Sequence, residues 1–432
     1  MDVSFILEDL NDAQRSAVTS ESNKLLVLAG AGSGKTKVLV HRIAWLIKAL
    51  GSSTHSILAV TFTNKAANEM TGRIEMILDQ PVPELWCGTF HSISNKILRR
   101  HYHEAGLEKD FSILDSDDQL RIIKRVLKHL EIDDDQWPPE KVRWQINNWK
   151  DDGLRAKDID DNGDFNLEIL KKIYKEYDQY LNAENLLDFG ELILRSFELI
   201  KQNKELQQLY RNKFQHILID EFQDTNTIQF KWIKNLIGDK SSVTAVGDDD
   251  QSIYGWRGAK IENINKFAKE KETEIVRLEQ NYRSTENILN AANAVIGKNS
   301  NRLGKKLWTA GNKGELIEVF EAYSEQEEAN YVAEKVNKIV YEGDQHKDIA
   351  ILYRSNAQSR VIEEFLLRQN LPYVIYGGVR FYERLEIKNV VSYLRLCVNF
   401  NDNSAFERAI GAPTRGIGEK TLAAIRFYAG EK

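Results

Sequence analysis

The first 95 residues alternate between short apolar runs and amphipathic stretches. Residues 25–28 are all apolar and lead into Gly30, which is typical of a buried parallel strand. Apolar side chains then recur at helical spacing at Leu39, Ile43 and Leu46, and a second apolar run at residues 57–60 precedes a predicted helix. This alternation of strand and helix predicts an α/β domain.

The pattern changes between about residues 95 and 214, where long charged helical stretches such as 117–130 and 167–181 replace the strands. Apolar strands return at residues 217–219 and 243–246. We therefore interpret the helical block as an insertion into the α/β domain.

A second α/β series begins near Ile275. The pattern predicts strands at residues 316–322 and 349–353, and helices at about 325–341 and 357–369. Further helices are expected from there to the end of the sequence.

Composition places the chain among ordinary globular proteins but does not identify a partner. It has 432 residues, 42% of them hydrophobic and 29% charged, which is enough for several domains. The net charge of −6 means that any nucleic-acid binding must come from local basic patches. Cys87 and Cys397 show no spacing typical of zinc sites or disulfide frameworks, so a reducing cytoplasm fits best. The acidic first residues do not resemble a signal peptide, and no apolar run reaches membrane-spanning length.

A glycine-rich segment between the first strand and the first long helix is the clearest chemical signal. It consists of Ala29, Gly30, Ala31, Gly32, Ser33, Gly34, Lys35 and Thr36. Glycines at such a place let backbone N–H groups converge on phosphate oxygens, while the lysine reaches the β/γ-phosphates and the threonine ligates Mg²⁺. Ala29 departs from the glycine that the general pattern has at its first position, and the alternative interpretation is an ordinary glycine-rich turn.

A second signal strengthens the first. The apolar run at residues 217–219 ends in Asp220 and Glu221. The Mg²⁺ that accompanies ATP needs an acidic partner, which Asp220 supplies, and hydrolysis needs a group that orients and deprotonates water, which Glu221 can provide. Acids at the end of a strand can also be solvated caps, but their pairing with a phosphate loop favours a nucleotide site.

Three longer motifs carry a family resemblance. They are Asp-Glu-Phe-Gln-Asp-Thr at 220–225, Val-Gly-Asp-Asp-Asp-Gln-Ser-Ile-Tyr-Gly-Trp-Arg-Gly at 246–258, and Leu-Glu-Gln-Asn-Tyr-Arg-Ser-Thr at 278–285. With Leu-Asn-Asp-Ala-Gln-Arg at 10–15, they resemble the ordered motifs of the UvrD/Rep/PcrA group of superfamily-1 DNA helicases. The resemblance covers essentially the whole chain.

The resemblance implies a particular domain organisation. Residues 1–90 and 215–275 would form a first RecA-like motor domain, with residues 91–214 as its inserted helical domain. Residues 276–375 would form part of a second RecA-like domain, and 376–432 the start of a helical accessory domain. We also expect two later motifs of the family to be missing, which would leave the chain weak or inactive by itself.

The resemblance also assigns roles at the nucleotide. Gln14 would read adenine, Tyr282 would stack on it, Gln251 would sense the γ-phosphate, and Arg283 would act as an arginine finger. The catalytic set is then Lys35, Asp220, Glu221, Gln251 and Arg283, with Thr36 and Asp220 as the Mg²⁺ ligands. Lys37 stands where the family has an arginine; a lysine keeps the charge but loses the planar surface that stacks on a base.

DNA contacts follow from the same comparison. A motor on single strands needs aromatic faces for bases and donors for phosphates. Phe62 would stack on a base, although a place in the core is its alternative, and Gly416 and Gly418 resemble a loop that holds duplex phosphates, with an ordinary loop as the alternative. The remaining implied contacts are Asn64, Arg73, His91, Tyr254, Trp256, Arg257, Arg354 and Asn356. We interpret Trp137, Trp144 and Trp149 of the helical block as packing residues.

The function implied is an ATP-dependent translocase and DNA helicase with 3′→5′ polarity, acting in repair or replication. Its expected ligands are ATP, Mg²⁺, single-stranded DNA and junctions of single- and double-stranded DNA. Proteins of mismatch and nucleotide excision repair, self-association on DNA, and a cytoplasmic, nucleoid-associated location are further implications. Two alternatives stand beside it: an ATP- and DNA-binding remnant without productive turnover, and a helicase–nuclease, which would need an additional nuclease domain.

Overall fold

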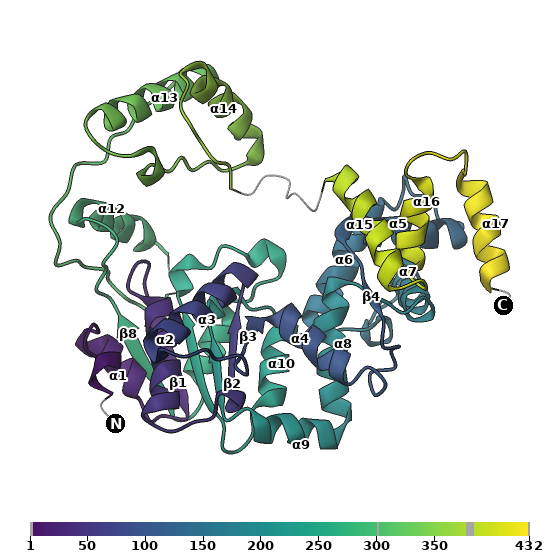
Figure 1. Cartoon of the computed structure of the whole chain (residues 1–432), viewed down its shortest axis with the longest axis horizontal. Coiled ribbons are helices and arrows are strands. Elements are labelled where there is room, and N and C mark those ends of the chain that lie inside the picture. Colours follow the sequence, from purple (N-terminus) through teal and green to yellow (C-terminus); the bar gives the residue numbers. More distant parts are fainter. Residues whose placement is uncertain (1–2, 300–301, 377–383, 431–432) are drawn as a thin grey trace. The chain divides into compact units, whose positions relative to one another are not determined.

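Six parallel strands form one sheet, and the strand that leads into the phosphate loop lies second from one edge (Figure 1). From edge to edge they are β3 (Trp86–Thr89), β2 (Ile57–Thr61), β6 (His216–Ile219), β7 (Ser242–Gly247), β1 (Lys24–Ala29) and β8 (Thr273–Leu278). The computed structural model describes residues 3–299, 302–376 and 384–430, and the chain divides into two units, Met1–Glu315 and Leu316–Lys432. The predicted α/β class is confirmed, and the first unit holds the whole sheet.

Both faces of the sheet are buried, which explains why its strands are apolar throughout. Leu25 and Val27 of β1 belong to one hydrophobic cluster, whereas Leu26 and Leu28 point to the opposite face and belong to another. The first face is covered by α1 (Asp12–Thr19), α2 (Lys35–Lys48) and α3 (Asn64–Leu78). The second is covered by α4 (Phe90–Arg100), α8 (Phe189–Gln202), α10 (Thr227–Leu236) and α11 (Glu262–Ala268).

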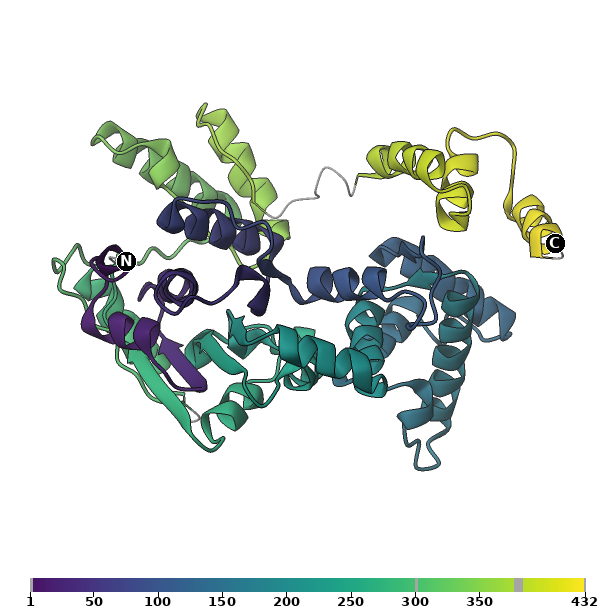
Figure 2. The same ribbon diagram turned by 60° about the horizontal axis from the view of Figure 1, so that its bottom comes forward.

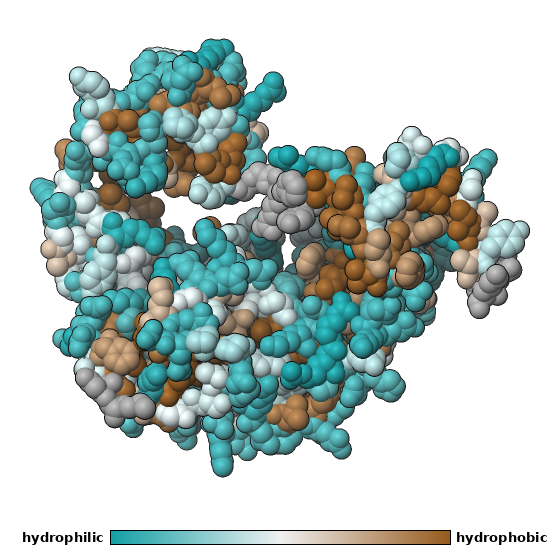
Figure 3. Space-filling view, viewed as in Figure 1, coloured by the Kyte–Doolittle hydropathy of each residue, from teal (hydrophilic) through white to brown (hydrophobic). Residues whose placement is uncertain are grey.

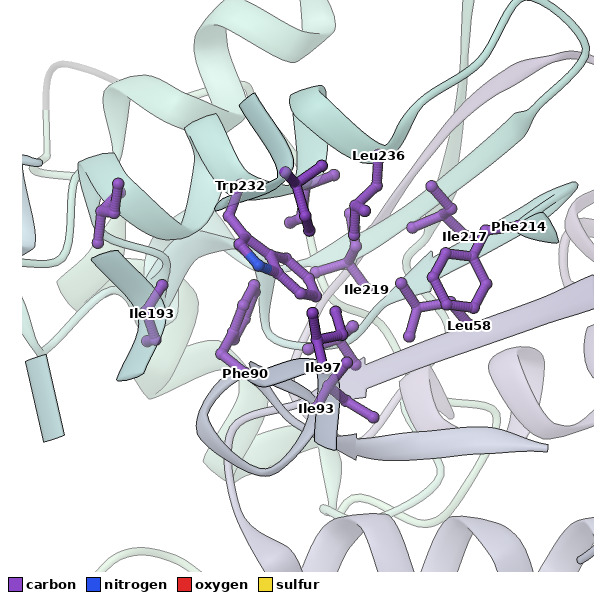
Figure 4. Close-up of a cluster of buried hydrophobic side chains, with 14 of the residues drawn as sticks. Leu58, Phe90, Ile93, Ile97, Ile193, Phe214, Ile217, Ile219, Trp232 and Leu236 are labelled. Carbon is purple, nitrogen blue, oxygen red and sulfur yellow. The ribbon is translucent and has the colours of Figure 1, made fainter. Parts of the chain in front are cut away.

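Trp232 of α10 lies at the centre of the second cluster (Figure 4). It is fully buried, its ring meets Phe90 edge to face at a centroid distance of 6.0 Å, and its Nε1 donates to Ser196 Oγ at 3.0 Å. Phe90 lies at the start of α4, which leads into the helical block, and Ser196 belongs to α8 in the later part of the block. The block is therefore anchored in the core of the sheet domain.

The rest of the block has a hydrophobic core of its own. That core is built by α5 (Ser116–His129), α6 (Pro139–Asp152) and α7 (Phe165–Ala183), while α9 (Lys204–Lys213) leads back to the sheet. Trp149 stacks on Tyr174 at 5.9 Å, and Trp137 is partly buried against the same core, as expected of packing residues. The prediction for Trp144 is wrong: 59% of its surface is exposed, because it lies on the face of α6 that points away from this core.

The sixth strand changes the picture of the middle of the chain. β8 pairs with β1 from Lys24–Thr273 to Ala29–Leu278, so it is an edge of the first sheet (Figure 2). The hydrophobic pattern predicted a second α/β series from here, whereas the first unit continues through α12 (Glu286–Ile296) to Glu315. Strand pairing decided this placement, and an apolar pattern does not identify the partner of a strand. The division into motor, insert and accessory domains stays a prediction.

The second unit contains α13 (Glu325–Tyr341) and α14 (Ser359–Arg368), which match the predicted helices and share a small core around Ala333 and Leu366. The predicted strands at 316–322 and 349–353 are wrong, since neither segment is in a ladder within the described residues. Leu316 and Leu352 are largely exposed there, because an extended apolar segment becomes a strand only when a neighbour accepts its hydrogen bonds.

Three further helices complete the described chain: α15 (Leu385–Val398), α16 (Asn403–Gly411) and α17 (Glu419–Gly430). Apolar side chains gather over α15 and α16 in the space-filling view (Figure 3), and Leu385, Val390 and Leu394 are exposed there. None of the helices in the described ranges combines the length and the hydropathy that crossing a lipid bilayer requires.

Candidate nucleotide site and nucleic-acid interface

The glycine-rich loop joins the carboxyl end of β1 to the first turn of α2. Gly32 and Gly34 have φ values of 67° and 91°, which a residue with a Cβ rarely adopts. Ser33 stabilises the turn, since its Oγ donates to Gly30 O at 2.7 Å. No side chain caps α2 within the described residues, so its first N–H groups are directed at the space where a phosphate would lie.

Lys35 and Glu221 meet directly beneath this loop. Lys35 Nζ is 2.8 Å from Glu221 Oε2, and the side chains are only 12% and 35% exposed. Glu221 follows β6 with φ 48°, a left-handed backbone conformation that turns its side chain toward the loop. The phosphate loop and the end of β6, which are far apart in sequence, thus bring together Lys35 and Glu221, the residue predicted to deprotonate water.

Asp220 and Asp224 add two more carboxyl groups beside that pair. Burial and the charge of Glu221 raise the pKa of Asp220 to about 6 and that of Asp224 to about 6. Asp224 Oδ1 is buried and has no hydrogen-bond partner in the described part of the chain. Three carboxyl groups therefore share the single ammonium of Lys35, an excess of acid that fits a divalent cation bound with oxygen ligands.

Gln14, Lys37 and Tyr282 lie on the other side of the loop. The buried Gln14 donates from Nε2 to Ser33 O at 2.9 Å and accepts from Asn11 N at 3.1 Å, so its amide supports the loop. Asn11 Nδ2 also donates to the hydroxyl of Tyr282 at 2.7 Å, and the Tyr282 ring is exposed. Lys37 Nζ donates to the carbonyl of Asp9 at 2.6 Å. The three predicted residues therefore surround one end of the loop.

The segment after β8 is hydrogen-bonded to the phosphate loop. Asn281 Nδ2 donates to Ala31 O at 2.6 Å, and Tyr282 N donates to Gly32 O at 2.9 Å. A Cβ at Gly32 would lie 2.7 Å from Arg283 Cβ, so only glycine permits this approach. Arg283 is thereby placed next to the loop with its side chain exposed.

Gln251 is connected to the same site through a chain of hydrogen bonds. Its Nε2 donates to Asp248 Oδ2, and Asp248 N donates to Gln223 Oε1 at 2.9 Å. Gln223 Nε2 in turn donates to Glu221 Oε2 at 2.9 Å. The loop after β7 is therefore linked to the Lys35–Glu221 pair by the side chains of Gln251, Asp248 and Gln223 and by the backbone N–H of Asp248.

An aromatic surface follows Gln251 directly. Phe62 and Tyr254 stack at a centroid distance of 5.5 Å with an interplanar angle of 18°, so Phe62 lies at this surface and is only partly buried. The guanidinium of Arg257 lies 5.4 Å from the Tyr254 ring and 4.6 Å from the Trp256 ring. Trp256 itself is 67% exposed, which leaves its face open for a flat ligand.

The other predicted DNA contacts of the first unit are scattered around it. Asn64 is the exposed first residue of α3, and Arg73 pairs with Glu69 on the same helix. His91 contacts Phe189 edge to face at 5.8 Å, and burial lowers the pKa of its imidazole to about 4. A neutral imidazole there cannot act as a cationic phosphate ligand near neutral pH.

Four predicted contacts belong to the second unit. Arg354 and Asn356 are exposed at the start of the turn that leads to α14. Gly416, with φ 73°, and Gly418 lie between α16 and α17, and a Cβ at either would meet nothing within 4 Å. The open surroundings of both glycines are compatible with a close backbone approach to a ligand.

Several residues of the site carry no role in the sequence analysis. Gln223, Asp224 and Asn281 lie inside the long motifs at 220–225 and 278–285, so the motifs were the signal, but their contacts depend on the fold. Asn11 precedes Gln14 and is recognisable as a helix cap, since the two form a capping box. Lys305, described below, had no signal in the sequence.

Two family models match the chain. One, described as the UvrD/REP helicase N-terminal domain, matches residues 10–272, and one described as the UvrD-like helicase C-terminal domain matches residues 276–431.

Three curated relatives show how far the similarity extends. DNA helicase II of Haemophilus influenzae is 53% identical over 436 residues, which cover 100% of this chain and 60% of that protein. DNA helicase II of Escherichia coli is 53% identical over 427 residues, with coverages of 99% and 59%. ATP-dependent DNA helicase PcrA of Staphylococcus epidermidis is 44% identical over 426 residues, with coverages of 98% and 58%. The chain thus spans about three fifths of the length of these relatives.

Proposed function

The chain belongs to the UvrD/REP helicase family, and on that premise we propose that it is an ATP-driven translocase and helicase acting on single-stranded DNA. The relatives that carry the names DNA helicase II and ATP-dependent DNA helicase PcrA support this proposal. The family resemblance stated from the motifs is confirmed.

One observation in the structure carries the proposal. A chain of hydrogen bonds runs from Lys35 through Glu221, Gln223 and Asp248 to Gln251, and the exposed Trp256 lies five residues further on. A nucleotide that displaces Lys35 from Glu221 therefore acts on the first link of a chain that ends beside an aromatic surface. A motor requires coupling of this kind, because its affinity for the DNA strand must change with the state of the bound nucleotide.

The roles at the nucleotide follow from position. N–H groups of the loop and of the first turn of α2 bind phosphate oxygens, Lys35 neutralises the β/γ-phosphates, and Glu221 orients and deprotonates the attacking water. Arg283 offsets the charge that develops on the transferred phosphoryl group, since it lies beside Gly32. Adenine reaches the side of the loop where Tyr282 is exposed and Gln14 supports the turn.

Mg²⁺ is the cation that we propose for the acidic side of the site. Thr36 and Asp220 would hold it, with Asp224 as a further partner, and the excess of carboxyl groups there supports the assignment. When bound, it would neutralise charge on the phosphate oxygens. Below about pH 6 both aspartates are protonated, so metal-dependent nucleotide binding is expected to weaken there.

Single-stranded DNA is the proposed track. Phe62, Tyr254 and Trp256 provide stacking surfaces, and Arg257, Asn64 and Arg73 lie within the same unit as donors. In the second unit, Arg354 and Asn356 are proposed as further contacts to a single strand, and Gly416 and Gly418 as contacts to a duplex. His91, neutral and partly covered by Phe189, would act by packing or as a neutral hydrogen-bond partner.

The wider function remains part of the proposal. We propose 3′→5′ movement, junctions of single- and double-stranded DNA as substrates, and roles in repair or replication alongside proteins of mismatch and nucleotide excision repair. Self-association on DNA and location at the nucleoid are predictions of the same kind.

The test is steady-state ATP hydrolysis with and without a single-stranded oligonucleotide, together with strand displacement on duplexes that carry a 3′ or a 5′ tail. DNA-stimulated hydrolysis that Lys35→Ala abolishes, with displacement only from the 3′ tail, is the expected result. Nucleotide and DNA binding without stimulated turnover would instead favour the binding-remnant alternative. Displacement from the 5′ tail would contradict the proposed polarity.

A further inference from the structure

A lysine outside every motif is buried among three aspartates. Lys305 Nζ lies 2.6 Å from Asp248 Oδ1, 2.7 Å from Asp249 Oδ1 and 2.9 Å from Asp250 Oδ2. Its side chain is 2% exposed, so this ammonium is removed from water and its contacts with these carboxylates replace hydration. We call residues 302–308 the strap and residues 248–250 the acid loop.

The rest of the strap binds the acid loop as well. The guanidinium of Arg302 makes two hydrogen bonds to Asp250, at 2.6 and 2.7 Å, and Leu303 N donates to Asp249 Oδ2 at 2.8 Å. Bidentate pairs of this kind fix orientation as well as distance. Each carboxylate of the acid loop is thus held by a group from the strap.

The acid loop depends on this cation. The ligand oxygens of its three aspartates lie within 4.8 Å of one another, an arrangement that could otherwise hold a metal ion. Burial alone would lower the pKa of Lys305, but Asp248 and its two neighbours raise it above the usual value. Without the ammonium, Asp248 and Asp249 would be buried carboxylates with no cation between them, and their repulsion would open the loop, although Arg302 would still pair with Asp250.

The strap reaches the nucleotide site in two ways. Lys305 holds Asp248, which accepts from Gln251 Nε2 and thereby positions the proposed γ-phosphate sensor. At the end of the strap, Leu307 packs onto Gly30, where a Cβ would come within 2.1 Å of its side chain, and Trp308 O accepts from Asn281 N at 2.7 Å. The strap therefore joins the acid loop to the phosphate loop and to the segment that carries Arg283.

We infer that Lys305 is a positioning residue that holds Gln251 in place to detect the terminal phosphate of ATP, by neutralising the acid loop from within. This inference rests on the proposed function, because it assigns Gln251 its partner there. It predicts that Lys305 affects discrimination between ATP and ADP more than nucleotide binding as such, since ADP lacks the phosphate that Gln251 contacts.

The decisive experiment compares Lys305→Met with Lys306→Met in the full chain. Lys306 is the adjacent, exposed lysine of the strap and serves as the matched control. Titrations with a fluorescent ADP and with a non-hydrolysable ATP analogue give the two dissociation constants. For Lys305→Met we expect the ATP analogue to bind about tenfold more weakly, the scale of one lost hydrogen bond to a charged group, and ADP to change less than about twofold. Lys306→Met is expected to match the parent.

A second variant tests whether any loss of discrimination between ATP and ADP is caused by misfolding. Lys305→Ala is titrated with and without propylammonium, which can fill the space of the missing ammonium and its stem. Recovery of ATP discrimination with the amine supports the inference, and methylated amines too bulky for the site serve as the control. An unchanged ratio of the two constants in Lys305→Met, or in folded Lys305→Ala with no response to the amine, overturns it.

The same data separate this inference from the proposed function. The ratio of dissociation constants requires no turnover, so a parent that discriminates ATP from ADP but shows no DNA-stimulated hydrolysis refutes the motor and still tests Lys305. Conversely, an active parent with an unaffected Lys305→Met variant refutes the positioning role alone.

Discussion

Replacing Glu221 by glutamine should change nucleotide binding and turnover in opposite directions. In the absence of nucleotide, Glu221 Oε2 holds Lys35 Nζ at 2.8 Å and also accepts from Gln223 Nε2 at 2.9 Å. Lys35 must leave this carboxylate to reach a phosphate. Glutamine keeps the size and shape of the side chain but removes the charge that competes for the lysine.

The size of the effect follows from exposure and geometry. With side chains 12% and 35% exposed, the Lys35–Glu221 pair is partly open to water, and such a pair is worth about 1 kcal/mol. Releasing Lys35 should therefore tighten ATP binding by about fivefold. Loss of the base that deprotonates water should at the same time lower kcat by about 10²–10⁴.

The assay is titration with a fluorescent ATP analogue alongside steady-state hydrolysis with saturating single-stranded oligonucleotide. Glu205→Gln, an exposed acid on α9, removes the same charge far from the loop and should leave both quantities unchanged. The gain in affinity should also shrink in 1 M salt, where exposed charges are screened over about 3 Å. Equal or weaker ATP binding by Glu221→Gln would show that the ion pair does not compete with the nucleotide.

Three further predictions concern other parts of the molecule. Trp256→Ala should weaken single-stranded DNA binding by about 1–3 kcal/mol in fluorescence titrations, whereas Trp144→Ala, also an exposed tryptophan, should not; equal effects would make Trp256 an ordinary surface residue. Lys150→Met should destabilise the helical insert by about 3–5 kcal/mol in urea denaturation, because a fully buried ammonium 2.9 Å from Asp188 leaves uncompensated carboxylates behind; a loss below about 1 kcal/mol would contradict this. Asp224→Asn should raise the unfolding temperature by about 2–4 °C at pH 8 and leave it unchanged near pH 4, because burial and the charge of Glu221 raise the pKa of the parent carboxyl to about 6. The parent protein therefore loses stability as pH rises through that value, and a gain of equal size at both pH values would refute the assignment.

Local sequence was sufficient wherever a short segment defines its own geometry. Gly32 and Gly34 adopt positive φ because the turn into α2 requires it, and the order of small residues before Lys35 predicted that turn. The apolar runs of β1 and β6 were recognisable because strands buried on both faces are hydrophobic throughout. The helices at 325–341 and 359–368 followed from periodicity alone.

Pairing across long distances could not be predicted in this way. Residues 316–322 and 349–353 have the composition of strands, yet no strand in the described residues pairs with them, while β8 joined the first sheet because β1 offered a free edge. Trp144 shares its helix with the buried Trp149, and only the packing of α6 decides which ring faces solvent.

The sequence by itself therefore determined the family, the phosphate loop and the identity of the acids that follow β6, because these are properties of contiguous motifs. The tertiary structure decided how they work together: that Glu221 holds Lys35, that Gln223 connects it to Asp248, and that Lys305 neutralises the acid loop. The physical reason is that a charge or hydrogen bond acts over a few ångströms, and only folding brings residues that are 25 to 186 positions apart in the sequence within that range.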